Sequence, residues 1–206
     1  MGTKRKAQLD HLANELRRAY DAGQAGNFDE AVDLARAVVE KAKGLGVSSA
    51  FALWQVAVAA DNGGKLEMAF DYITRALQID PLDNTYRGSF EIIAKRLRAA
   101  LASPERAADD PSTPRLYELL VRAGEADVGA HSAMTRFWLA KGETAKAAQI
   151  ADAVTLLNPT DREAWLCKAE VARASGDLAT AETCLAEAAA LEGEPVPFAI
   201  PEVASA

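Results

Sequence analysis

Two stretches of the sequence decide the fold: residues 142–158 read GETAKAAQIADAVTLLN, and residues 176–192 read GDLATAETCLAEAAALE. They lie 34 residues apart, and each begins with a glycine that is followed five residues later by an alanine, Ala147 in the first stretch and Ala181 in the second. Because the chain is rich in alanine, a single match of this kind can arise by chance. A true repeat has to recur elsewhere along the chain.

The same spacing recurs twice more, in the N-terminal half of the chain. The glycines that begin it are Gly26, Gly64, Gly142 and Gly176. A small residue lies seven positions before each glycine, and alanine or valine lies five and twelve positions after it. The three columns are Ala19, Ala57, Thr135 and Ala169; then Ala31, Ala69, Ala147 and Ala181; then Val38, Ala76, Val154 and Ala188. Four glycines with matching residues in three columns indicate a repeat.

The spacing predicts a unit of two helices, A and B, joined by a turn. Helices that cross at about 8–10 Å need small side chains at the crossing point. Glycine supplies the positive φ that ends helix A, and Pro81 and Pro159, five residues beyond the last column, end helix B. The composition agrees, since about a fifth of the residues are alanine and no stretch has the alternation of a strand. We therefore predict an all-α fold.

This pattern resembles the tetratricopeptide repeat, whose 34-residue signature places Trp, a Leu-Gly pair, Tyr, Ala, an aromatic residue, Ala and Pro at fixed positions. Residues 164–188 carry Trp165, Ala169, Ala181 and Ala188 in these columns. The Tyr column departs from the signature and reads Ala22, Ala60, Trp138 and Ala172. The resemblance covers residues 9–192. It implies a right-handed α-solenoid of about five helix-turn-helix repeats, with the A helices lining a concave groove.

The repeats are expected to fall into two halves. Residues 9–102 hold the N-terminal repeats and include a long helix A of the third repeat over 84–102. Residues 103–113, SPERAADDPST, are expected to form a polar loop that acts as a joint. Residues 114–192 hold the C-terminal repeats, which open with Thr113 as N-cap and Pro114 in the first helical position.

A tail of residues 193–206 follows the last repeat and contains three prolines. Its composition predicts an extended segment. We expect Phe198 and Ile200 to lie on the final repeat or on a second copy of the chain, and a disordered terminus is the alternative.

The sequence carries no recognisable catalytic or metal-binding motif. His11 and His131 lie in different repeats without acidic or cysteine companions at ligand spacing. No nucleophile elbow, phosphate loop or dinucleotide fingerprint occurs. Cys167 and Cys184 are expected to be free structural thiols. We therefore expect neither an enzyme nor a protein that holds a cofactor or a metal.

Charge and hydropathy argue against two classes of partner. Residues 1–102 carry a net charge of +1 and residues 103–206 a net charge of −8, and neither half has a basic patch of the nucleic-acid type. No apolar run approaches the roughly 18 residues of a membrane span, and the basic N-terminus lacks the apolar core of a signal peptide. We expect a cytoplasmic protein that neither binds nucleic acid nor inserts into a membrane.

What remains is binding to another protein. The resemblance places these helix-A residues in the groove: Arg17, Tyr20, Phe51, Trp54, Gln55, Val58, Lys95, Arg136, Glu163, Glu170 and Arg173. Phe51, Trp54 and Val58 have the spacing of an apolar anchor for a partner's side chain, and packing against a neighbouring helix is the alternative.

The leading interpretation is a non-catalytic scaffold or adaptor that binds a peptide or helix of its partner in the groove. The alternative is a chaperone for secreted or assembled subunits, similar to the class II chaperones of type III secretion. One tetratricopeptide subfamily clamps acidic C-terminal tails with Lys and Asn, but the matching positions here include Leu16, Tyr20 and Gln55. Binding to such tails is not expected, and a homodimer is possible.

Overall fold

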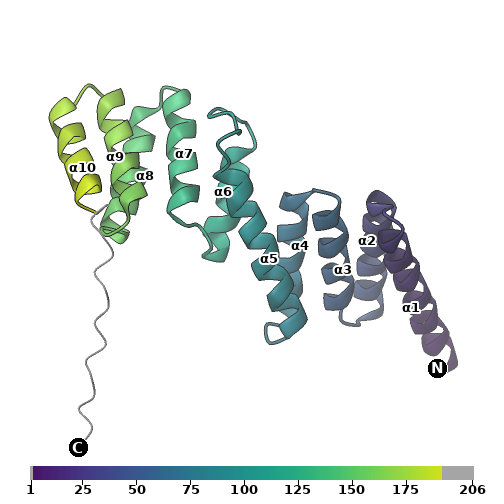
Figure 1. Cartoon of the computed structure of the whole chain (residues 1–206). Helices are drawn as coiled ribbons and strands as arrows, with labels where there is room; N and C mark the ends of the chain where they lie inside the picture. The colour runs from purple at the N-terminus through teal and green to yellow at the C-terminus, as the bar shows by residue number, and fades with distance from the viewer. Residues whose placement is uncertain (1, 192–206) are drawn as a thin grey trace, which may run out of the picture. The chain divides into compact units, whose positions relative to one another are not determined.

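The computed structural model describes residues 2–191, which form ten α-helices and no strand (Figure 1). The helices are α1 (Gly2–Gln24), α2 (Phe28–Leu45), α3 (Ala50–Asn62), α4 (Leu66–Ile79), α5 (Asn84–Leu101), α6 (Thr113–Ala123), α7 (Val128–Ala140), α8 (Thr144–Leu157), α9 (Arg162–Ala174) and α10 (Leu178–Ala190). The expected all-α class is confirmed. The expected tail at 193–206, with Phe198 and Ile200, lies outside the described residues.

The four repeat glycines lie where the sequence spacing predicts, each in the turn that joins a helix A to a helix B. Gly26, Gly64, Gly142 and Gly176 have φ angles of 81°, 72°, 74° and 79°. A φ in this range is costly for any residue with a Cβ atom. The glycines therefore end α1, α3, α7 and α9 and let the chain reverse into the next helix.

Every residue of the three repeat columns is buried, with at most 3% of its surface exposed. These positions belong to both helices of each pair, so the small side chains meet where helix A crosses helix B. The register proposed from the sequence is therefore confirmed, and the described residues are built from repeated helix pairs.

Substitution of a turn glycine should destabilise the protein because of the positive φ at that residue, without any steric clash of the new side chain. A Cβ atom added at Gly64 would meet nothing within 4 Å, but φ there is +72°. We expect Gly64→Ala to cost about 1 kcal/mol. Gly88 is a matched control, because it lies inside α5 and is equally unobstructed; Gly88→Ala should stabilise by about 0.5–1 kcal/mol. Urea denaturation measures the free energy of unfolding of both variants. Equal changes in that free energy would contradict the assignment of Gly64 to the turn.

The chain divides into two compact units, residues 1–130 and 131–206. In the first unit α1 contacts α3, and α3 contacts α5, so the three A helices form one layer. Helices α2, α4 and α6 pair with them as B helices. The core between the layers is built from large side chains, among them Phe70, Ile73, Ile93, Leu97 and Leu120.

The irregular third repeat has the helix A that the sequence predicts, α5, and a capped start. The Asp83 carboxylate accepts hydrogen bonds from the backbone N–H groups of Thr85 and Tyr86, at 2.8 and 3.0 Å. Helix α6 begins one residue earlier than expected: Ser112 is its N-cap, and Thr113 is already helical. The assignment of Thr113 as N-cap is therefore corrected, because its side chain instead accepts a hydrogen bond from Arg106.

The loop between α5 and α6 is organised by Arg106, which also pairs with Asp110. Residues 103–113 lie within the first unit, whereas the division between the units falls inside α7. The role of this loop as a joint stays a prediction.

The second unit contains most of α7 together with α8, α9 and α10. Ala147, Ala151, Cys167 and Val171 form a buried cluster, against which Trp138 packs. Asp161 and Asp177 cap α9 and α10 by accepting backbone hydrogen bonds. Cys167 and Cys184 are both buried and free, and burial raises the pKa of each thiol. The expectation of structural thiols is confirmed.

Candidate functional site

A small depression with a volume of about 60 Å³ lies on the A-helix layer of the first unit. Its wall is built mainly by α1 and α3. Four of the groove residues expected from the sequence line it, namely Tyr20, Trp54, Gln55 and Val58. The structure therefore brings these four side chains together around one concavity.

The indole of Trp54 contributes both to the depression and to the packing of α3 against α5. It lines the depression on one side, while its Nε1–H donates a 2.9 Å hydrogen bond to the Ser89 hydroxyl on α5. Its ring centroid lies 6.2 Å from that of Tyr86, also on α5. Trp54 is thus partly a packing residue between α3 and α5, so its truncation would disturb the helix layer as well as the surface.

Phe51 and Tyr20 are the aromatic side chains that the layer leaves to solvent. Phe51 is 48% exposed and Tyr20 is 52% exposed. The Phe51 ring centroid lies 5.2 Å from that of Trp54, within the range of favourable aromatic pairing. An aromatic surface that begins in the depression therefore continues along α3.

Gln55, in the wall of the mainly apolar depression, has a side-chain oxygen that could accept a hydrogen bond. Its Oε1 atom is buried and accepts no hydrogen bond from the described residues. An unpaired buried carbonyl costs about 1–3 kcal/mol relative to a paired one. A donor that entered the depression would recover part of that free energy.

Two cations that the resemblance places in the groove, Arg17 and Lys95, differ in position. Arg17 lies three residues before Tyr20 on α1, so both share one face of that helix. Lys95 lies nine residues after Tyr86 on α5, which is two and a half turns and places it on the opposite side of the helix. Both are exposed, and neither forms an ion pair with any residue of 2–191.

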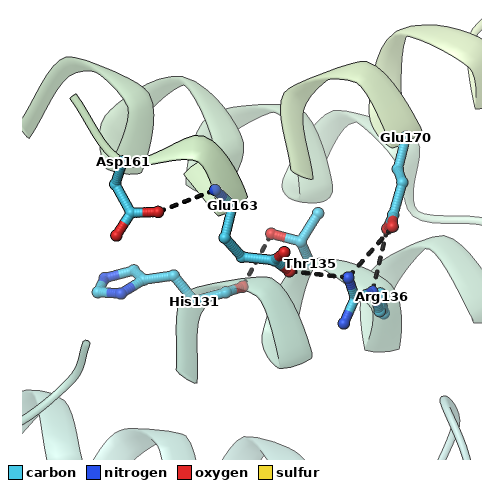
Figure 2. Close-up of polar contacts among 6 residues, drawn as sticks. All are labelled: His131, Thr135, Arg136, Asp161, Glu163 and Glu170. Atoms are coloured by element: carbon cyan, nitrogen blue, oxygen red, sulfur yellow. Dashed lines mark hydrogen bonds and ion pairs between the residues drawn. The ribbon is translucent and has the colours of Figure 1, made fainter. Parts of the chain in front are cut away.

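In the second unit, three of the charged residues that the sequence is expected to place in the groove form a network between α7 and α9 (Figure 2). The Arg136 guanidinium lies 2.9 Å from a carboxylate oxygen of Glu163 and 3.1 Å from one of Glu170. The two carboxylates are seven residues apart on α9, and hence two turns apart on one face. The hydrogen bonds to Glu170, and the two nearby charges, raise the pKa of Arg136.

This network reduces the local negative charge in a half of the chain, residues 103–206, whose net charge is −8. One guanidinium charge offsets one of the two carboxylates it binds. Arg173, three residues after Glu170 on α9, is exposed and has no ion pair within the described part of the chain. The A-helix face of this unit is therefore close to neutral around Arg136.

Some residues of the site escaped the sequence reasoning. Ser89 and Tyr86, which hold Trp54, belong to the third repeat, where no turn glycine fixes the register. Gln24 and Asn62 line the depression from the ends of α1 and α3. Gln24 and Asn62 could have been located only from the repeat spacing, since each lies two residues before a turn glycine.

Within residues 2–191, no group of three or more His, Cys, Asp or Glu side chains is placed to hold a metal ion. No helix there combines the length and the apolar character needed to cross a bilayer.

No protein-family model matches the sequence, and no curated protein matches it. Solved structures with a similar helix arrangement include MamA AMB-1, with 17% identity, 90% of this chain and 94% of that chain covered, and a TM-score of 0.47. MamA 41-end from Desulfovibrio magneticus RS-1 has 18% identity, coverages of 93% and 97%, and a TM-score of 0.41. The TPR2AB domain of yeast Sti1, in a complex with pHSP90, has 15% identity, coverages of 89% and 78%, and a TM-score of 0.39.

Proposed function

We propose that the chain is a non-catalytic scaffold or adaptor that binds a segment of another protein on the A-helix face of its first unit. The observation that carries this proposal is the exposed aromatic surface of Phe51 and Tyr20 beside a depression with an unused buried acceptor, Gln55 Oε1. Aromatic side chains on a concave surface are typical of residues that dominate the free energy of protein association.

The depression limits the chemistry of what can enter it. Its volume suits part of one side chain, and its walls are mainly apolar. A partner should therefore place the end of an apolar residue there, stack more apolar surface on Phe51, and direct a hydrogen-bond donor toward Gln55. Acidic residues beside this anchor would meet Arg17, which lies on the Tyr20 face of α1, and would chiefly affect the association rate and its salt dependence.

The test uses a library of random 12-residue peptides displayed on phage. Peptides selected on the full chain should share an apolar anchor next to Asp or Glu. For a selected peptide, Phe51→Ala should raise the Kd about tenfold, equivalent to about 1.4 kcal/mol. Isothermal titration calorimetry measures this. Phe51 is a sharper probe than Trp54, because Trp54 also supports α5 through Ser89.

Two control variants accompany the titration. Leu82→Ala removes an exposed apolar side chain from the turn between α4 and α5, and Arg36→Ala removes an exposed charge from the B helix α2. Both should leave the Kd unchanged. If Phe51→Ala binds as tightly as the wild-type chain, or if the controls weaken binding equally, the binding face lies elsewhere and the proposal fails.

A further inference from the structure

Asn62 is followed directly by Gly63, and none of the other four asparagines of the chain precedes a glycine. The side-chain amide of an asparagine can react with the backbone nitrogen of the next residue, which is one reason why asparagine is a thermolabile residue. A glycine in that next position has no Cβ atom to obstruct the approach of the two groups. The pair Asn62-Gly63 therefore combines the two residue types that favour this reaction.

The pair lies at the end of a helix, where the backbone can open locally. Asn62 is the last residue of α3 and is exposed. The Gly63 N–H donates a 3.0 Å hydrogen bond to the backbone oxygen of Ala59, and Gly64 and Lys65 donate the turn bonds that follow. Helix ends open at a low cost in free energy, because few contacts are lost. Such opening frees the Gly63 nitrogen and lets the Asn62 side chain approach it.

The reactive side chain is also free to move. The Asn62 amide makes no hydrogen bond to any residue of the described part of the chain. Asn158, at the end of α8, differs in both reacting groups. Its Nδ2 atom donates a 3.1 Å hydrogen bond to the Val154 backbone oxygen, and the next residue is Pro159, whose nitrogen carries no hydrogen. Of these two helix ends, only that of α3 presents both groups in a reactive form.

We propose that Asn62-Gly63 is a site of spontaneous deamidation. The Gly63 nitrogen loses its proton and forms a bond to the Cγ atom of Asn62, while the side-chain nitrogen leaves as ammonia. Water then opens the succinimide ring that results. Cleavage of the new bond to Cγ gives aspartate, whereas cleavage of the original peptide bond gives isoaspartate, in which the main chain runs through Cγ. Water is the only co-reactant that this sequence of steps needs.

Either product places a carboxylate in the wall of the depression. None of the described residues that line it, Asn62 among them, is charged before the reaction. Two cations near the end of α3 already offset other carboxylates, since Lys65 pairs with Asp29 and Arg96 pairs with Asp61. The new charge should therefore repel a partner segment that carries acidic residues. This consequence rests on the proposed function, whereas the reaction itself does not.

The direct test is peptide mapping by mass spectrometry of the full chain during prolonged incubation in buffer. The peptide that contains residue 62 should gain about 1 Da, since OH replaces NH₂, and an isoaspartate methyltransferase should label it. Conversion there should be at least about tenfold faster than at Asn14 and Asn158, which no glycine follows. A smaller ratio would overturn the proposal. Asn62→Gln is the matched control and should not convert, because its reaction requires a larger ring that forms more slowly.

A titration tests the effect of the new charge on binding. For a peptide selected on the chain as described above, Asn62→Asp should raise the Kd about threefold or more, and Asn62→Gln should leave it unchanged. An unchanged Kd for Asn62→Asp, with weaker binding by Phe51→Ala, would overturn the effect of the charge but not the proposed function. Undiminished binding by both variants would instead overturn the proposed function, while the conversion of Asn62 would still be decided by the mass measurement.

Discussion

Replacement of Phe70 by alanine is expected to cost about 3–5 kcal/mol of unfolding free energy, the largest effect of a single substitution considered for this chain. Phe70 is 1% exposed and packs against Phe90 across the contact between α4 and α5. Its removal would leave a cavity in the core between two repeats. Urea denaturation followed by circular dichroism measures the change.

Phe51→Ala is the matched control for Phe70→Ala, because it removes the same atoms from the surface of the same unit. With half of its surface already exposed, Phe51 should contribute less than about 1 kcal/mol to folding. Similar losses of stability in the two variants would show that the assignment of Phe70 to the core and Phe51 to the surface is wrong.

Enlargement of Ala181 to leucine is expected to cost about 1–3 kcal/mol. Ala181 lies in the second repeat column and is 2% exposed, at the point where α10 crosses α9. Three added carbon atoms would force the two helices apart, since the crossing leaves no space for them. The midpoint of urea unfolding of the full chain should fall accordingly.

Ala186→Leu adds the same three carbons to the exposed side of the same helix. Its effect should stay within about 0.5 kcal/mol. An unfolding midpoint for Ala181→Leu that matches those of Ala186→Leu and the wild-type chain would contradict the repeat register on which the fold description rests.

The repeat architecture could be read from the sequence because it depends on small residues at fixed spacing. Glycine at the turn and alanine at the crossing are dictated by backbone conformation and by the approach of two helices, and both leave a direct trace in the sequence. This is why Gly142, Ala147 and their equivalents located the helix pairs. The third repeat lacks a turn glycine, and there the N-cap of α6 was misplaced by one residue.

The candidate site could be predicted only in part, since it depends on contacts between repeats. The expected groove positions follow from the resemblance to the tetratricopeptide repeat, and four of them, Tyr20, Trp54, Gln55 and Val58, line one depression. The hydrogen bond from Trp54 to Ser89 spans 35 residues and requires the register of α5, which the sequence left open. The pairing of Arg136 with both Glu163 and Glu170 likewise depends on how α7 lies against α9.

The order of contacts along the first unit bears on how quickly the protein acquires its structure. Each of its helices contacts only the next helix or the one after it. Chains whose contacts are this local in sequence fold in microseconds to milliseconds, because no long loop has to close before the first contacts stabilise it. Any adjacent pair of helices can serve as the nucleus from which ordering spreads to its neighbours.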